Sequence, residues 1–160
     1  MDSFEIKFSG KVLERGFWLY VVQMTNPKNQ RFFYVGMTGD SAALKAAALF
    51  VRLGRHLDVK ENAMGNTLFR AIKNEKKLLP FLYQLDFEII GFYLSPENEK
   101  AHRKIRGEIS HMEDKLHKDL KDGGYEVLGF DWPIQKPIVS IDWQKKYEEI
   151  LEETKYRFKK

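Results

Sequence analysis

The fold of this chain is decided by Trp18-Leu19-Tyr20-Val21-Val22, taken together with Tyr34-Val35-Gly36-Met37-Thr38. Both stretches are rich in aromatic and β-branched residues, which favour strands. The first lies in an almost continuous apolar run, 17–24, which is typical of a strand buried on both faces. Turn chemistry in Asn26-Pro27-Lys28-Asn29 separates it from a second strand over 31–37. The two strands are therefore predicted to form a β-hairpin in the middle of a sheet.

The same patterns predict the remaining elements. Further strands are expected over 4–8, as a half-buried strand, and over 87–94. One helix is expected over 41–57, and a second from the cap Asn66 to just before Pro80. A long helix with Pro96 in its first turn is expected to run to Gly123-Gly124. A last helix is expected at the end of the chain, with one face formed by Tyr147, Ile150, Leu151, Thr154 and Phe158. The expected fold class is α+β, a small central antiparallel sheet of the hairpin plus a third strand, flanked by helices.

Length and composition set the outer limits. At 160 residues, residues 1–160 are expected to form a single domain with its own core, and 43% apolar content argues against disorder. There is no cysteine, which excludes disulfides and thiolate metal sites. No apolar run approaches the ~20 residues that cross a bilayer, and 1–5 do not resemble a signal peptide. No membrane partner and a cytoplasmic location are therefore expected. The net charge of +4 modestly favours a polyanionic partner.

Tyr20 and Tyr34 are candidates for chemistry because each lies on one strand of the hairpin. Two neighbouring phenols could together bind a water or a phosphate oxygen, and an ordered phenol can transfer a proton. Direct opposition of the two rings needs a three- or five-residue turn, whereas a four-residue turn would send them to opposite faces unless a bulge intervenes. Core packing is the alternative for either ring. Gly36 would let a substrate backbone come close, or would simply mark a strand end.

Arg52 and His56 lie on one side of the expected helix over 41–57, flanking a stripe of leucines, and Arg55 lies on the far side. A guanidinium can clamp a phosphate through two hydrogen bonds, and a neighbouring imidazole can donate to the same group. The alternative is an arginine at the boundary of the core and a packed histidine.

Glu108 and Glu113 flank the apolar stripe of the long helix on opposite sides, and Glu113 lies nearer its centre. Such a carboxylate is a hard oxygen ligand that suits Mg²⁺, and a single carboxylate suits a nuclease with one metal. Simple exposure at the rim is the alternative. The three histidines of this helix (His102, His111 and His117) do not share a face, so a zinc site is not expected.

Taken in order, these features resemble the GIY-YIG endonuclease family over about residues 17–128, with Trp18-Leu19-Tyr20 and Tyr34-Val35-Gly36 standing for its two tripeptides. The resemblance implies a GIY-YIG-like fold and a hydrolase that binds DNA and cuts its phosphodiester bonds with Mg²⁺ or Mn²⁺. It also implies a role for each candidate: Tyr20 as the proton acceptor that activates water, Tyr34 assisting it, Arg52 holding the scissile phosphate, His56 supporting the tyrosine–phosphate network, and Glu113 carrying the metal.

The expectation is therefore a metal-dependent endonuclease core at 17–128 with a C-terminal extension, 129–160, for specificity, dimerisation or packing. One active site cuts one strand per encounter, so double-strand cleavage would need a homodimer or two visits. Two alternatives stay open. One is a catalytically inactive nucleic-acid-binding module on the same fold, and the other is a purely structural or protein-interaction domain.

Overall fold

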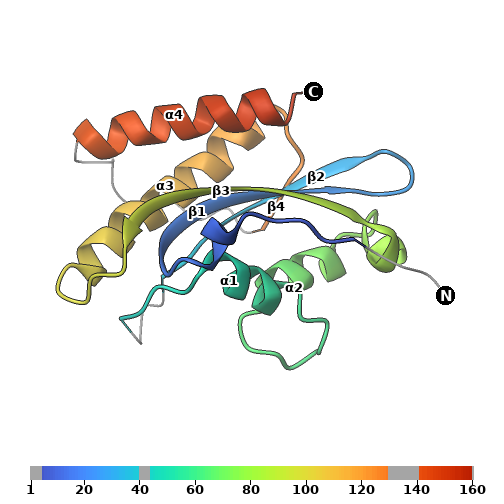
Figure 1. Cartoon of the computed structure of the whole chain (residues 1–160). Helices are drawn as coiled ribbons and strands as arrows, with labels where there is room; N and C mark the ends of the chain where they lie inside the picture. Colours follow the sequence, from blue (N-terminus) through green and yellow to red (C-terminus); the bar gives the residue numbers. More distant parts are fainter. Residues whose placement is uncertain (1–4, 40–43, 130–140, 160) are drawn as a thin grey trace.

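The protein is an α+β fold built on one mixed sheet of four strands, in the order β3-β1-β2-β4 (Figure 1). A computed structural model describes residues 5–39, 44–129 and 141–159. The strands are β1 (Gly16–Thr25), β2 (Arg31–Met37), β3 (Asp86–Pro96) and β4 (Val127–Leu128). The helices are α1 (Leu49–His56), α2 (Thr67–Asn74), α3 (His102–Asp122) and α4 (Ile141–Arg157), with 3-10 helices η1 (Gly10–Leu13) and η2 (Leu79–Gln84).

The expected α+β class, the hairpin and the third strand are confirmed, but a purely antiparallel sheet is wrong. β1 pairs antiparallel with both β2 and β3, whereas β4 pairs parallel with β2 at Phe33 and Tyr34. A strand of two residues has no periodicity to detect, so the sequence pattern could not predict it.

The loop between β1 and β2 contains five residues, 26–30. The side-chain oxygen of Asn26 accepts hydrogen bonds at 3.0 Å from the backbone N–H groups of both Lys28 and Gln30. Asn29 adopts a φ of 59°, a left-handed conformation that asparagine tolerates better than most residues. These local bonds fix the loop length and with it the register of the hairpin.

That register places the two candidate tyrosines on the same face of the sheet. Tyr20 lies opposite Gly36, and Tyr34 lies opposite Val22. Because side chains alternate between faces along a strand, the two phenols share a face but stand one diagonal step apart. Direct opposition, which the sequence left open, does not occur although the turn has five residues, while the shared face is confirmed.

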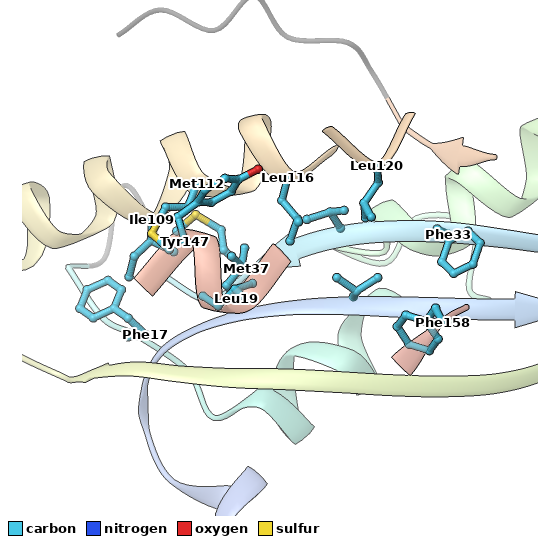
Figure 2. Packing of buried hydrophobic residues seen from close by; sticks show 14 residues of the cluster. Phe17, Leu19, Phe33, Met37, Ile109, Met112, Leu116, Leu120, Tyr147 and Phe158 are labelled. Carbon is cyan, nitrogen blue, oxygen red and sulfur yellow. The ribbon is translucent and has the colours of Figure 1, made fainter. Parts of the chain in front are cut away.

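The first face of the sheet packs against α3 and α4 (Figures 1 and 2). Its buried residues come from the strands (Phe17, Leu19, Val21, Phe33, Val35, Met37), from α3 (Ile109, Met112, Leu116, Leu120), from α4 (Tyr147, Ile150) and from Phe158 directly after α4. Each fully buried large apolar side chain contributes about 1.5–3 kcal/mol relative to exposure. The expected stripes of both helices are confirmed, and the described part of the C-terminal extension contributes to the core.

The second face packs against α1, α2 and the segment after α2. Its buried residues are Trp18, Tyr20, Val22, Met24 and Phe32 from the strands, with Leu49, Leu68, Ile72, Leu78, Leu85 and Leu128 around them. Both faces of β1 are thus covered, as its continuous apolar run predicts. The candidate tyrosines lie on this second face.

The expected strand over 4–8 is wrong for the residues that the structure describes. Residues 5–9 have no regular structure, and Ile6 is 81% exposed. Phe8 packs instead on Phe50 of α1, with 4.7 Å between the ring centroids. The alternating apolar residues therefore do not pair with the sheet, and the ring of Phe8 packs on a helix instead. Phe4 lies outside the described residues.

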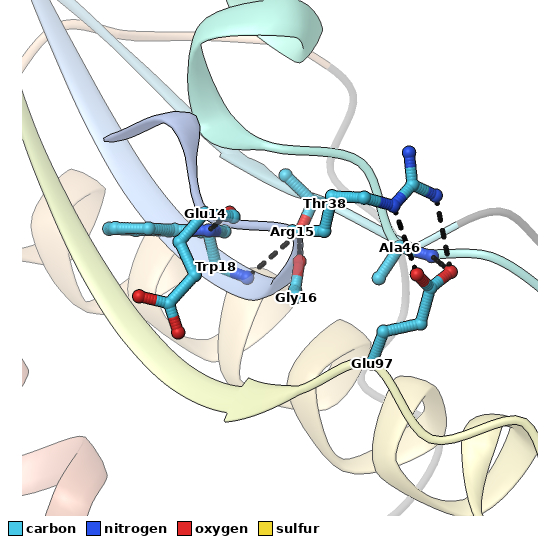
Figure 3. A network of polar contacts seen from close by, with 7 residues as sticks. All are labelled: Glu14, Arg15, Gly16, Trp18, Thr38, Ala46 and Glu97. Atoms are coloured by element: carbon cyan, nitrogen blue, oxygen red, sulfur yellow. Dashed lines mark hydrogen bonds and ion pairs between the residues drawn. The ribbon is translucent and has the colours of Figure 1, made fainter. Parts of the chain in front are cut away.

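The helix expected over 41–57 begins only at Leu49, and 40–43 lie outside the described residues. The segment before it is held extended by a polar network (Figure 3). Arg15 donates two hydrogen bonds to Glu97 at 3.0 and 3.3 Å, and Glu97 accepts one from the Ala46 backbone at 2.9 Å. Arg15 also forms a β-bridge with Ala48. These tertiary contacts override the helical propensity of the alanine-rich segment.

A second part of the same network joins the beginning of β1 to the residue that follows β2 (Figure 3). The Thr38 hydroxyl donates to the Gly16 carbonyl at 2.6 Å and accepts from the Trp18 backbone at 2.8 Å. Trp18 in turn accepts from the Thr38 backbone and donates its indole N–H to the Glu14 carbonyl. The end of β2, where the candidate site begins, is therefore fixed to β1.

The remaining expectations are largely confirmed. β3 covers the strand expected over 87–94, and α2 follows Asn66 and ends before Pro80. The expected proline in the first turn of the long helix is wrong, because Pro96 ends β3 opposite Gly16 and α3 begins at His102. Among the described ranges, no helix is long and apolar enough to cross a membrane.

Candidate functional site

Tyr20 is fully buried between two glycines of the neighbouring strands. On β2, the ring leans over Gly36, where a Cβ atom would come within 2.5 Å of the Tyr20 Cζ and Oη atoms. On β3, Gly91 lies opposite Tyr20, and a Cβ atom there would collide with Leu49 of α1. The two glycines therefore give room to the phenol on one side and to α1 on the other.

His56 lies between the two phenols. Its ring centroid is 6.0 Å from that of Tyr20 and 5.6 Å from that of Tyr34, both in edge-on contact. The residue is 1% exposed. Burial, and next the positive charge of Arg52, lower the pKa of His56 to about 3. The imidazole is therefore neutral at physiological pH.

A hydrogen-bond chain joins Tyr34 to His56 through Thr67, the first residue of α2. The Tyr34 hydroxyl is 3.0 Å from the Thr67 hydroxyl, which is 2.6 Å from Nδ1 of His56. Sequence analysis did not single out Thr67. The only feature of the sequence that marked Thr67 was its position directly after the cap Asn66. Its contact with the hairpin arises from the packing of α2 on the sheet.

Arg52 lies one turn before His56 on α1, and Arg55 is exposed on the other side, as expected. The Arg52 charge lowers the pKa of both tyrosines and of Glu113, so it lies near all three. Among the described residues, buried polar atoms of Arg52 (Nε), Tyr20 (Oη) and His56 (Nε2) find no hydrogen-bond partner of good geometry. Buried polar atoms are rarely left unpaired, so this group calls for a water or a ligand.

Both phenols are protonated at neutral pH. Burial raises the pKa of Tyr20 well above its usual value, the nearby Tyr34 adds to the rise, and Arg52 opposes it. Burial also raises the pKa of Tyr34, and the hydrogen bond to Thr67 opposes that rise. In this state the phenols are hydrogen-bond donors. Tyr20 would need additional positive charge nearby to act as a proton acceptor.

Glu113 reaches the site from α3, on the opposite face of the sheet, past the edge of β2 at Met37. The Met37 backbone N–H at this edge donates to the Glu113 carboxyl, and within the described residues β4 pairs with β2 at Phe33 and Tyr34. Burial raises the pKa of Glu113 to about 8, and the neighbouring Asp114 adds to the rise. Arg52, Arg106 and the Met37 backbone N–H lower it. The carboxyl is thus mostly protonated at neutral pH in the metal-free protein.

Arg106 is a second residue that sequence analysis missed. It lies seven residues before Glu113, which is about two turns along the same flank of α3. Its Nε atom is buried and, in the part of the chain that the structure describes, has no hydrogen-bond partner. The seven-residue spacing between Arg106 and Glu113 was the signal in the sequence that could have identified it. Glu108, five residues before Glu113, projects about 140° away from it around the helix.

The donor set at Glu113 fits a cation that keeps most of its own water. In residues 5–39, 44–129 and 141–159, no three His, Asp or Glu side chains are grouped to hold a metal. One carboxylate oxygen donor, beside unpaired polar atoms of Tyr20 and His56, suits Mg²⁺ or Mn²⁺ in an otherwise hydrated form. The two nearby guanidinium groups work against cation binding and favour an anion at the same place.

The five residues predicted from the sequence (Tyr20, Tyr34, Arg52, His56 and Glu113) therefore come together from β1, β2, α1 and α3, with Thr67 and Arg106 beside them. Comparison of the chain with models of protein families, with curated proteins and with solved structures finds no match. The functional conclusion rests on the residues and their arrangement.

Proposed function

We propose that the protein is a divalent-metal-dependent endonuclease that hydrolyses DNA phosphodiester bonds at a single active site. One observation carries the proposal. Polar atoms of Tyr20, Arg52 and His56 that are buried without a hydrogen bond of good geometry among the described residues gather beside the carboxyl of Glu113. A phosphodiester offers anionic oxygens to the donors, and its hydrolysis depends on positioning and charge neutralisation.

Each group has a defined part in this proposal. Arg52 holds the scissile phosphate, and His56, which is neutral, supports that contact through Nε2. Tyr20 first loses its phenol proton to solvent, and the resulting phenolate Oη takes a proton from the attacking water, which Tyr34 helps to orient. The new P–O bond forms as the bond to the leaving oxygen breaks, and the leaving oxygen takes a proton from solvent. When bound to Glu113, Mg²⁺ or Mn²⁺ supplies positive charge that favours ionised oxygen over the neutral phenol or water.

A nucleic-acid-binding module without chemistry is the second candidate. It is favoured by the charge around Glu113, because Arg52 and Arg106 both lie near this carboxyl and would repel a cation. The raised pKa of Glu113 adds to this argument, since a proton must leave before a metal can bind. In this reading the two arginines bind phosphates, and no bond is cut.

A plasmid-nicking assay tests the proposal. Supercoiled DNA is incubated with the protein and Mg²⁺ or Mn²⁺, with EDTA as the control. A single site cuts one strand per encounter, so nicked circles should appear before linear DNA. Linear DNA appearing at once would instead indicate a homodimer. Glu113→Gln should abolish nicking, and the matched variant Glu108→Gln should keep it.

The outcomes separate the candidates. Nicking that survives EDTA, or that is equal in wild type and Glu113→Gln, contradicts the proposed enzyme. Salt-dependent binding to a labelled duplex without any nicking supports the binding module. No binding even at low salt contradicts both and leaves a structural or protein-interaction domain.

A further inference from the structure

Thr67 is the middle member of a three-residue hydrogen-bond chain that ends on His56. Its hydroxyl lies 3.0 Å from Oη of Tyr34 and 2.6 Å from Nδ1 of His56. The threonine hydroxyl has one hydrogen, so it can donate to only one of these partners and must accept from the other. The direction of the chain therefore decides which nitrogen of the neutral imidazole carries the proton.

The shorter contact indicates the direction. The donor–acceptor distance of an N–H···O hydrogen bond is rarely shorter than about 2.7 Å. At 2.6 Å, the contact fits a Thr67 hydroxyl that donates to an unprotonated Nδ1. Neutral Tyr34 then donates to Thr67, whereas an ionised Tyr34 would accept from Thr67, and it is this second bond that opposes the rise of the Tyr34 pKa. The remaining proton of the imidazole lies on Nε2.

We propose that Thr67 is a positioning residue that holds His56 in the tautomer with its proton on Nε2, so that His56 presents an N–H donor to the site. Nε2 is buried and has no partner among the described residues. It lies on a ring held between Tyr20 and Tyr34, next to the positively charged Arg52. A donor in this place suits an anionic oxygen.

The identity of that oxygen rests on the proposed function, in which it belongs to the scissile phosphate. The reversed chain, with His56 donating to Thr67, would instead place a bare nitrogen lone pair at Nε2. His56 would then be a base that could accept the proton of Tyr20. The two directions thus assign opposite roles to the same histidine, and the tautomer separates them.

Nitrogen-15 NMR of histidine-labelled protein reads the tautomer without any DNA or metal. The chain has four histidines, and the signal of His56 is identified by its loss in His56→Gln. At pH 7 the wild type should show a protonated Nε2 and an unprotonated Nδ1. Thr67→Ser and Tyr34→Phe should keep this state, because a hydroxyl donor to Nδ1 remains. Thr67→Val should lose it and show a mixture of tautomers. A protonated Nδ1 in the wild type, or an unchanged spectrum in folded Thr67→Val, overturns the proposal.

Activity provides the second arm. If the protein nicks DNA, Thr67→Val should lower the rate at saturating DNA about tenfold or more, consistent with one misplaced donor, while Thr67→Ser restores most of it. Equal rates for Val and Ser would contradict the role of the hydroxyl. If no nicking is observed at all, the proposed function fails, and the NMR result still decides the role of Thr67. Thr67 is exposed at the start of α2, and thermal unfolding of each variant checks that the fold is kept.

Discussion

Gly36 of β2 lies directly against the phenol of Tyr20 on β1, with no room for a Cβ atom between them. Such an atom would come within 2.5 Å of both Cζ and Oη of Tyr20. The glycine therefore acts through the tyrosine, because it lets a fully buried phenol keep its hydroxyl at the site. This close approach is a property of the hairpin register, in which the two residues are paired.

Gly36→Ala should displace the Tyr20 ring and destabilise the fold by about 1–3 kcal/mol, as overpacking of a tight core does. Any nicking activity should fall as well, since the Tyr20 hydroxyl moves away from Arg52. Gly107→Ala is the matched control, because nothing lies within 4 Å of the added Cβ atom. That change should raise the free energy of unfolding by about 0.5–1 kcal/mol, since glycine is unfavourable inside a helix. Urea unfolding of both variants measures the difference, and equal stability of the two would contradict the close packing.

How far the sequence determines this site is clear from its individual residues. Apolar and β-branched runs identified β1, β2 and β3, and helical periodicity identified the stripes of α3 and α4, which are buried against the sheet. Whether Tyr20 and Tyr34 lie on the same face of the sheet depends on the loop length, which Asn26 fixes through its side-chain hydrogen bonds. Local sequence patterns thus predicted most of the fold, and they also predicted the side of α1 on which Arg52 lies.

Non-local contacts account for what the sequence did not predict. Alanine-rich sequence before Leu49 favours a helix, but Glu97, fifty-one residues after Ala46, holds that backbone extended. The role of Thr67 likewise appears only when α2 packs beside the hairpin. Neither contact leaves a signal within a window of a few residues, so helical propensity and spacing alone could not find them.

Arg52→Ala should abolish nicking with little change in folding, because the side chain is partly exposed and its Nε has no partner within the described residues. Loss of one preorganised donor to a phosphate typically lowers the rate by about 10²–10³-fold. Arg55→Ala on the exposed side of α1 should keep most activity. Initial nicking rates and melting temperatures of the two variants provide the comparison. Similar losses at both positions, with melting temperatures unchanged, would refute the assignment of Arg52.

Arg106→Ala should weaken DNA binding and reduce its dependence on salt if Arg106, whose Nε is buried without a partner among the described residues, binds a phosphate. Losing one phosphate contact lowers the slope of log K against log salt concentration by about one. Arg103→Ala is the matched control on the same helix, where Arg103 is exposed. Fluorescence anisotropy of a labelled duplex at several salt concentrations measures both slopes. An unchanged slope for Arg106→Ala would mean that Arg106 does not contact a phosphate of the bound DNA.

The raised pKa of Glu113 makes a prediction about stability that needs neither DNA nor metal. In the unfolded chain this carboxyl ionises near its usual pKa of 4.5, whereas in the folded protein it does so at about 8. Between these values the folded state holds the proton more tightly, so this group's contribution to stability falls as pH rises and becomes constant above about 8. His56 acts in the opposite sense at lower pH. Its pKa is lowered from 6.5 to about 3, so its contribution rises with pH between those values.

Glu113→Gln removes the first effect and leaves the second, so the difference between variant and wild type isolates Glu113. In EDTA, the variant should gain free energy of unfolding relative to the wild type from about pH 4.5 upward, reaching on the order of 4 kcal/mol above pH 8. Urea unfolding at one-unit steps from pH 4 to 9 measures this difference, and the contribution of His56 cancels from it. Glu108→Gln, on the other flank of α3, should follow the wild type at every pH. A constant difference across the range would contradict the raised pKa of Glu113, and a rise for Glu108→Gln instead would mean that the register of α3 is wrong.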